Sequence, residues 1–354
     1  ETATTPLPTI ATTDLELSDS GDFTSANTSP QQNVTQNLIQ NLNRRLTIST
    51  ESTASVLEVN PNQVEIRPME RCVLEDFTQC SKSHLWKLMM SFYDRKGPES
   101  WSQGIVPHFI TCNTFIAKSY VKVLQGFLQD GLRDNAILPL DVNEPLYIVE
   151  LGAGSGKFTY FMLKYLTEIL KPSSSSSSSS NNSLFPINKI KFIMTDFTEN
   201  NFIYWQNHPA LKEYFDSGIL DAGIFDAVND KEIKLWKSNI TLTQGSCKNP
   251  IVIVANYLFD TLYHDIFQID HGDLREGLVS TGSKHAEEPD PLDPEIIQRL
   301  DNHYKYQSIQ AKDYYQDEEG DEEHLAKILQ WYTHNFNHNQ ASILYPIGAL
   351  RALR

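Results

Sequence analysis

The sequence predicts an α/β fold organised around a parallel sheet, and three adjacent features support this prediction. Residues 147–151 form a short apolar run, typical of a buried parallel strand, with the acidic Glu150 near its end. Alternating glycines follow at positions 152, 154 and 156. Apolar residues then recur with a helical period up to Leu170, and Pro172 ends the pattern. Strand, glycine turn and helix together predict the first half of a βαβ unit, in which bare backbone can approach a ligand closely.

The spacing of the glycines distinguishes between two kinds of ligand. A dinucleotide-binding turn has the pattern Gly-x-Gly-x-x-Gly and holds a pyrophosphate at a helix N-terminus. Here the turn reads Glu150-x-Gly152-Ala153-Gly154-x-Gly156. It resembles motif I of the class I S-adenosylmethionine (SAM)-dependent methyltransferases, which implies a Rossmann-like, doubly wound sheet. The resemblance also implies that the turn passes beside the amino-acid end of SAM, and that Glu150 binds its ammonium group directly or through water. A glycine turn without a ligand is the alternative.

Composition permits a large core and argues against some partners. Of 354 residues, 40% are hydrophobic, and the formal net charge is −16. This charge argues against nucleic acid as the main partner, because phosphate binding needs clustered Lys and Arg. No stretch is long and apolar enough to cross a membrane, and the four cysteines show no metal-binding or paired spacing. We therefore expect a cytoplasmic protein without a metal, or a mitochondrial one if a targeting segment precedes Glu1.

The chain divides into three parts by composition and pattern. Residues 1–62 are rich in Thr, Ser, Asn, Gln and Pro, and we expect them to be disordered because they can bury little apolar surface. Residues 63–140 contain two helical patterns, at 83–92 and 113–128. The second pattern places these residues on one side: Phe115, Ile116, Tyr120, Val123, Leu124 and Phe127. Residues 141–354 form the expected SAM-binding core, interrupted by a low-complexity Ser/Asn loop at 173–183. The resemblance implies that the helices of 63–140 cover the cleft, although packing alone would also explain them.

Two later strands are expected to place acids beside a nucleoside. Residues 189–195 form the second strand and end on Asp196, which we expect to accept hydrogen bonds from a ribose diol. A solvated strand-end cap is the other interpretation of this residue. Residues 222–225 form a short third strand that ends on Asp226. The resemblance implies that Asp226 contacts the adenine amino group, and Asp221 and Asp230 are close competitors for that role.

The fourth strand leads into a second family-like motif. Residues 250–255 are apolar and β-branched, and Ala-Asn-Tyr-Leu-Phe-Asp-Thr-Leu follows from Ala255. This run is similar to the Ala-Asn-Glu-Phe-Phe-Asp-Ala-Leu motif of MidA-type methyltransferases, whose mitochondrial members modify arginine in a respiratory-complex subunit. The resemblance places Asn256 at the cofactor and the transferable methyl group. Asn256 as an orienting group and Asp260 as an orienting group or base are the catalytic candidates, with a helix cap as the alternative for Asp260. Tyr257 and Tyr263 depart from the motif, which has Glu and Pro there.

These features predict a SAM-dependent methyltransferase whose acceptor, a protein side chain or a small molecule, is not identified. Two alternatives remain open. A methyltransferase-like protein could bind SAM, or nothing, and act as a scaffold through partners. A nicotinamide-dependent enzyme is the other alternative, which the glycine spacing and Glu150 disfavour.

The last ninety residues or so predict an incomplete sheet. A full class I sheet continues beyond its fourth strand and finishes in a hairpin. After Asn256, residues 342–345 are the only further parallel candidate, and Pro346 ends that run early. Residues 266–269 and 277–280 are expected to pair as a hairpin across Gly272. We therefore expect a C-terminally incomplete fold with an open sheet edge beside the fourth strand.

Overall fold

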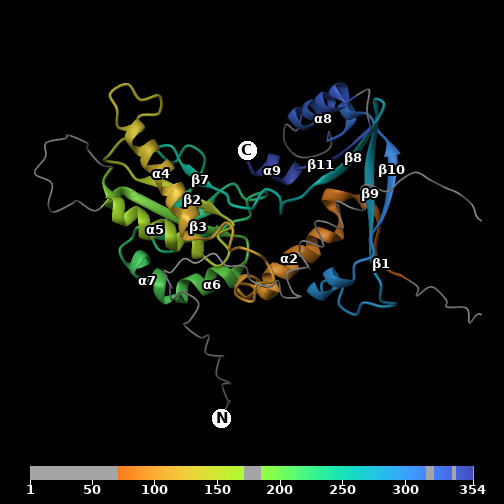
Figure 1. Ribbon diagram of the computed structural model, residues 1–354, viewed down its shortest axis with the longest axis horizontal. Coiled ribbons are helices and arrows are strands. Elements are labelled where there is room, and N and C mark those ends of the chain that lie inside the picture. The colour runs from red at the N-terminus through yellow and green to blue at the C-terminus, as the bar shows by residue number, and fades with distance from the viewer. Residues whose placement is uncertain (1–70, 171–184, 316–322, 337–339, 354) are drawn as a thin grey trace, which may run out of the picture.

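The computed structural model describes residues 71–170, 185–315, 323–336 and 340–353. The expectations for residues 1–62 and for the Ser/Asn loop at 173–183 lie outside these ranges. The described chain forms two lobes, each built on its own sheet (Figure 1). In these ranges, no helix combines the length and apolar character that crossing a membrane requires.

The first lobe contains the predicted parallel sheet. Its strands are β2 (Leu146–Leu151), β3 (Ile190–Asp196), β4 (Leu220–Ile224) and β7 (Val252–Val254). All neighbours are parallel, in the order β4-β3-β2-β7. The chain moves outward from β2 to β4 and then returns to the other side of β2. The strand order therefore reverses between β2 and β7, the position at which open α/β sheets bind ligands.

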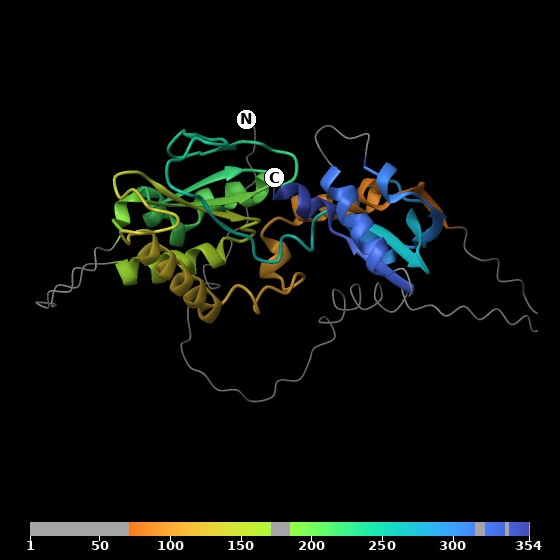
Figure 2. The same ribbon diagram turned by 90° about the horizontal axis from the view of Figure 1, so that it is seen from above.

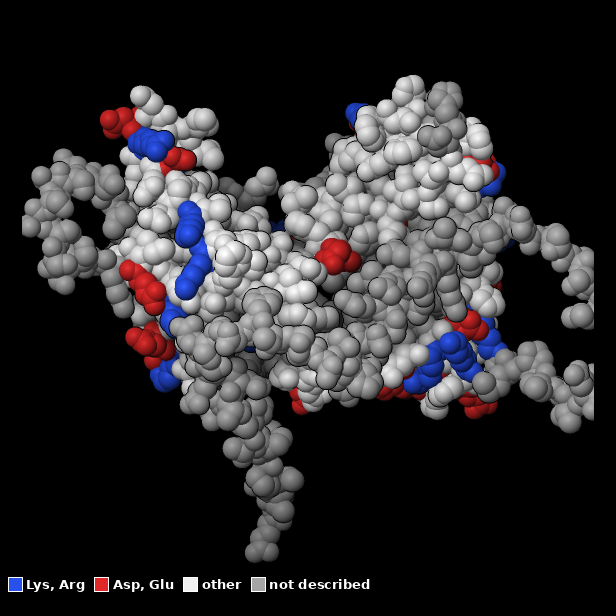
Figure 3. Space-filling view, viewed as in Figure 1, with Lys and Arg blue, Asp and Glu red and all other residues white. Residues whose placement is uncertain are grey.

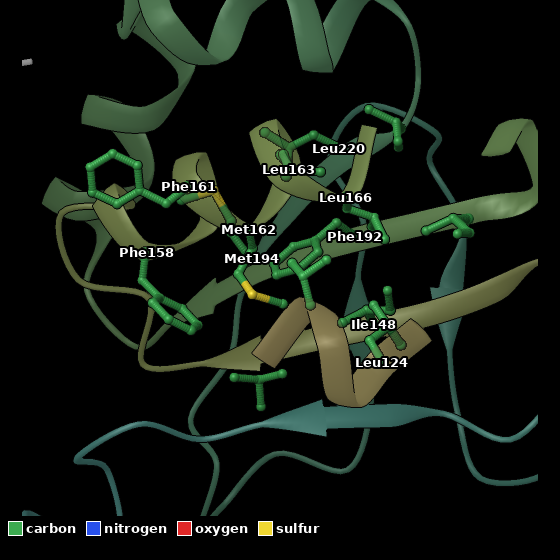
Figure 4. Close-up of a cluster of buried hydrophobic side chains, with 14 of the residues drawn as sticks. Leu124, Ile148, Phe158, Phe161, Met162, Leu163, Leu166, Phe192, Met194 and Leu220 are labelled. Carbon is green, nitrogen blue, oxygen red and sulfur yellow. The ribbon is translucent and has the colours of Figure 1, made fainter. Parts of the chain in front are cut away.

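Helices cover one face of this sheet. They are α4 (Thr114–Gly131), α5 (Lys157–Leu170), α6 (Glu199–Asn207) and α7 (Pro209–Asp216). Ile148 and Phe192 of the sheet lie among Leu124 of α4 and Met162 and Leu166 of α5 in one buried cluster (Figure 4). This face is formed by the even-numbered residues of β2, because side chains alternate along a strand.

The opposite face of the parallel sheet is covered without helices. Leu235 and Leu242 pack there against Tyr147 and Val149, and they belong to the hairpin of β5 (Ile233–Lys234) and β6 (Thr241–Leu242). The mixed α/β architecture with a parallel sheet is as predicted. The doubly wound arrangement is not present in the described residues, because the β5–β6 hairpin and a loop, and no helix, connect β4 to β7.

The second lobe is an antiparallel sheet. Its strands are β1 (Cys72–Gln79), β8 (Asp265–Asp270), β9 (Asp273–Ser283), β10 (His303–Ser308) and β11 (Gln340–Tyr345). Their order is β1-β9-β8-β11, with β10 paired to the other edge of β9. Phe267 and Ile269 of β8 pack against Leu325 and Leu329 of α8 (Glu323–Asn335). Figure 2 shows this lobe beside the first, with α9 (Ile347–Ala352) between them.

The second lobe corrects two expectations. The predicted hairpin is confirmed as β8 and β9. Residues 342–345 do form a strand, but they pair antiparallel with β8 and do not extend the parallel sheet. Residues 72–79, in the part expected to be helical, form β1 and pair with β9. In the described ranges, β7 is therefore the last strand of the parallel sheet and pairs only with β2.

Two helices connect the lobes. α2 (His84–Lys96) begins at Ser83, whose hydroxyl accepts the N–H of Leu85, and ends at Gly97. The four-residue α3 (Glu99–Ser102) follows. Short 3₁₀ helices lie at Cys80–Lys82, Ile187–Lys189, Pro294–Arg299 and Ala311–Asp313.

α4 buries part of the side that the pattern indicated, because Leu124 lies in the core and Ile116 and Phe127 pack against it. Ala117, Val121 and Leu124 face the core, whereas Phe115 and Val123 are 74% and 75% exposed. Apolar residues occupy much of the helix circumference, so periodicity alone did not decide its orientation.

On the face seen in Figure 3, Lys and Arg side chains form a row over α4 and α5.

Candidate functional site

A small cavity lies at the carboxyl ends of the parallel strands. We call it the strand-end cleft; its volume is about 70 Å³. Gly152, Asp196 and Asp226, which follow or end β2, β3 and β4, line it. Leu258, which follows β7, also lines it, and Met89, Met90 and Tyr93 of α2 form another part of its wall. Three of the predicted cofactor-binding residues therefore meet at the point where the strand order reverses.

The three glycines of the turn have different neighbours. All three have positive φ, at 66°, 55° and 75°, a region that favours glycine. A Cβ on Gly152 would lie 3.1 Å from Leu258 Cδ1, so this glycine keeps the cleft open. A Cβ on Gly156 would lie 2.6 Å from Met194 Cε, so this glycine lets α5 pack closely on β3. The open side of Gly154, where we expected a ligand to pass, faces the indole ring of Trp101.

Hydrogen bonds hold the backbone of the turn in place. The buried Ala153 donates its N–H to the carbonyl of Thr195 at 2.9 Å. The N–H of Gly154 donates to Asp196 Oδ2 at 3.1 Å, and its carbonyl accepts from Trp205 Nε1 at 2.8 Å. Ala153 therefore fixes the turn to β3 and does not line the strand-end cleft.

Glu150 lies away from the strand-end cleft. Its side chain belongs to the helix-covered face and accepts a hydrogen bond from the hydroxyl of Thr159 in α5. Burial raises the pKa of this carboxyl to about 8; the Thr159 hydrogen bond opposes the shift, and the charge of Asp196 adds to it. Glu150 is therefore protonated at neutral pH, which makes it a weak partner for an ammonium group.

Asp196 occupies the junction between the glycine turn and β3. It is 6% exposed and lines the strand-end cleft. Its Oδ1 accepts the N–H and the hydroxyl of Thr198, and its Oδ2 accepts the N–H of Gly154. The amide of Asn201 lies close to this carboxylate, but its geometry falls short of a hydrogen bond. Burial raises the pKa of Asp196, and the bonds from Thr198 and Gly154 oppose that shift. Oδ2 keeps one acceptor position for a further donor.

Asp226 reaches the strand-end cleft but is bonded within its own turn. Oδ1 accepts the N–H groups of Val228 and Asn229, at 2.9 and 3.2 Å. Oδ2 accepts the side-chain amide of Asn229 at 2.8 Å. The competitor Asp221 is a buried residue of β4. Its carboxylate accepts the N–H groups of Ala222, Lys237 and Ser238. Of Asp221, Asp226 and Asp230, only Asp226 lines the strand-end cleft.

The two catalytic candidates follow β7 in an irregular segment. Asn256 Oδ1 accepts the hydroxyl of Tyr120 at 2.8 Å, so this amide is directed toward α4 and does not line the strand-end cleft. Asp260 is exposed in a turn. No helix begins at Asp260, so a helix cap does not explain it. Tyr257, which stands where the MidA motif has Glu, is 63% exposed and has a φ of 54°.

Sequence reasoning missed two aromatic residues beside the turn. Tyr93 stacks on Trp101 with ring centroids 5.7 Å apart and an angle of 24° between the planes. Burial raises the pKa of Tyr93 to about 12, and the nearby carboxylates of Asp196 and Asp260 add to the shift. The Tyr93 hydroxyl therefore stays protonated near two carboxylates, that of the predicted cofactor-binding residue Asp196 and that of the catalytic candidate Asp260. Both aromatics come from a region where the sequence indicated helix but carried no motif.

Comparisons with known proteins give only distant similarities. No family model and no curated protein sequence matches the chain. One solved structure with some likeness is an uncharacterized protein of the COG1565 superfamily from Burkholderia thailandensis, with 10% identity and a TM-score of 0.31. Another is a COG1565 superfamily member from the same organism, described as an inferred methyl transferase and bound to S-adenosyl-homocysteine, with 10% identity and a TM-score of 0.28.

These similarities are partial as well as distant. The matches cover 66% of this chain, and 44% and 53% of the two solved chains. The chain therefore spans about half the length of those proteins. At such TM-scores the likeness supports no conclusion about fold or function, and the assignment depends on the site itself.

Proposed function

We propose that this protein binds SAM in the strand-end cleft and transfers its methyl group to an acceptor. The observation that carries the proposal is the convergence of Gly152, Asp196 and Asp226 on one cleft where the strand order reverses. The acids follow or end neighbouring strands, which is the arrangement a nucleoside needs for its ribose and base. A glycine beside Leu258 leaves room for the ligand.

The residues of the cleft fit a nucleoside, but the volume requires an opening of the wall. Met89, Met90 and Leu258 offer apolar surface to a base, and the two acids offer acceptors. The volume of about 70 Å³ is below the roughly 300 Å³ or more of sites for small molecules. We infer that α2 moves outward when the ligand enters. Ser91 and Arg95 fix α2 to the second lobe, through Leu292 and Asp290, so the lobe moves with it.

Methyl transfer from SAM depends mainly on positioning. SAM supplies an electrophilic methyl group, and the acceptor must approach it opposite the leaving sulfur. In this proposal Asp196 and Asp226 orient the nucleoside, and Tyr93 holds a hydroxyl proton between Asp196 and the acceptor side. Asp260 is the exposed carboxylate able to orient the acceptor or take its proton. The acceptor, a protein side chain or a small molecule, enters from the side of Asp260; we do not propose nucleic acid.

Calorimetry with SAM, S-adenosyl-homocysteine and NAD tests this proposal. SAM and its demethylated product should bind, and NAD should not. Asp196→Asn should weaken SAM about tenfold or more, because each bond from a carboxylate contributes about 1.5–3 kcal/mol. Asp216→Asn, at the exposed end of α7, serves as the control and should bind normally. Tight binding of NAD without SAM binding would refute the assignment.

A non-catalytic SAM-binding or scaffold protein is the second candidate. The direction of Asn256, toward Tyr120 and away from the strand-end cleft, favours it. Incubation with labelled SAM and a cell extract separates the two. Catalysis is supported if the parent protein transfers the label and the Asp260→Asn variant does not, while the variant keeps its affinity for SAM. Binding of SAM without any transfer supports the second candidate.

A further inference from the structure

A second cavity lies on the other side of the glycine turn. Its volume is about 170 Å³, larger than the strand-end cleft. We call it the helix-end cavity, because Ser155, Gly156 and Lys157 at the start of α5 form one wall. Pro98, Trp101 and Ser102 form a second wall, and the α6–α7 corner forms a third. No role in the proposed methyl transfer is assigned to it.

The chemistry of the lining favours a negative ligand. Lys157, His108 and His208 line the helix-end cavity, and no Asp or Glu does. Hydroxyl groups complete the polar lining: Ser102, Ser155, Tyr160 and Tyr204. In a chain of net charge −16, a cavity with three basic side chains and no acid is unusual. Within the described ranges, no carboxylate forms an ion pair with Lys157.

The cap of α7 determines which ring nitrogen of His208 can donate a hydrogen bond. Its Nδ1 accepts the N–H of Ala210 at 3.2 Å and so caps α7. In a neutral imidazole the other nitrogen then carries the proton, so Nε2–H can donate to a ligand. Burial lowers the pKa of His208, and burial together with Lys157 lowers the pKa of His108. His108 and Lys157 both line the helix-end cavity.

An aromatic wall separates this cavity from the strand-end cleft. Trp101 lines the helix-end cavity, and Tyr93, on which it stacks, lines the strand-end cleft. Trp101 also covers Gly154, where a Cβ would lie 2.8 Å from its Cζ2. A ligand in one space is therefore shielded from a ligand in the other by two stacked rings.

We propose that the helix-end cavity binds a small anion, a phosphate or carboxylate group, separately from the strand-end cleft. Lys157 supplies the formal charge, and His208 and the hydroxyl groups supply hydrogen bonds. The first N–H groups of α5, a helix of 14 residues, add a favourable dipole without being required. The group belongs to a small molecule, since the cavity holds no more than a few heavy atoms at about 170 Å³.

Titration calorimetry of the full chain with inorganic phosphate, and in parallel with acetate, tests the proposal. At least one of the two should bind saturably at one site. Lys157→Gln should weaken that binding about tenfold or more, because a charge-assisted hydrogen bond is lost. Lys164→Gln is the matched control. It removes the same charge from the same helix, at a residue that lies over the ring of Tyr165 and does not line the cavity. The control should bind like the parent.

A second variant and a competition experiment keep the test decisive. His208→Asn retains a side-chain acceptor to cap α7 but removes the imidazole, and it should also weaken the anion several-fold. S-adenosyl-homocysteine should leave the affinity for the anion unchanged. The proposal fails if neither anion binds saturably, if Lys157→Gln binds as well as Lys164→Gln, or if S-adenosyl-homocysteine displaces the anion. The direct titration needs no SAM, so it stands even if the proposed function fails.

Discussion

Replacing Gly154 by alanine would press a methyl group against the ring of Trp101. The new Cβ would lie 2.8 Å from Cζ2 and 3.1 Å from Cε2 of that ring, and Gly154 has a φ of 55°. Two separate effects should therefore destabilise the variant. The left-handed backbone costs an L-residue about 1–2 kcal/mol, and overpacking costs about 1–3 kcal/mol. Together they should lower the free energy of unfolding by about 2–5 kcal/mol.

A double-mutant cycle with Trp101→Ala separates the two effects. Without the indole ring only the backbone effect remains, so Gly154→Ala should then cost about 1–2 kcal/mol. The coupling free energy between the two positions should be about 1–3 kcal/mol. Urea unfolding, followed by far-UV circular dichroism, measures all four proteins. Gly104→Ala is the control for the backbone effect, because Gly104 has a φ of 70° and no neighbour within 4 Å.

Equal costs of Gly154→Ala in the two backgrounds would refute the contact between the turn and Trp101. The wall between the two cavities would then be misplaced, and with it the reason for treating them as separate sites. The contact would also be refuted if Gly104→Ala lowered the free energy of unfolding as much as Gly154→Ala does. The experiment therefore tests the local geometry on which both proposals depend.

Three further predictions concern ionisable side chains. Burial raises the pKa of Glu150 from 4.5 to about 8. Between these values the folded chain keeps a proton that the unfolded chain has lost, so stability should fall by about 1.4 kcal/mol per pH unit as pH rises. Glu150→Gln should flatten this slope in urea unfolding at several pH values, and an unchanged slope would contradict the burial. Arg299 lowers the pKa of Glu288 from 4.5 to about 2. That pair should stabilise the fold above pH 4.5 and lose its effect as pH falls toward 2, so Glu288→Gln should remove this part of the acid sensitivity. Asp221→Ala leaves three backbone N–H groups without their acceptor, at about 1–3 kcal/mol for each that stays buried. It should lower the melting temperature and speed amide exchange at Lys237 and Ser238, in the turn between β5 and β6; unchanged exchange there would show that water replaces the carboxylate.

Local sequence patterns were sufficient for the parallel sheet. The apolar run of β2, the glycines and the helical period of α5 are contiguous, so each follows from neighbouring residues. The strand-end positions of Asp196 and Asp226 were likewise visible, because each follows directly on an apolar run. Parallel strands end at the same edge of a sheet, which is why these two acids meet with Gly152 in one cleft.

The face on which a strand-end side chain lies was not visible in the pattern. Glu150 was expected at the ligand, but the alternation along β2 turns it toward α5 and Thr159. The pattern identified the buried side of α4 only in part, for a similar reason. Both sides of that helix are apolar, and only packing against the sheet selects Ala117 and Val121 as the buried ones.

The sequence by itself determined the elements whose signal is local: the βαβ unit, its glycine turn and the acids at its strand ends. Only the tertiary structure decided the pairings between distant segments. β1 pairs with β9 about 200 residues later, and Tyr93 and Trp101 reach the turn from a region without a motif. Such contacts depend on how two surfaces fit after the chain has closed a long loop, and no short pattern records that fit.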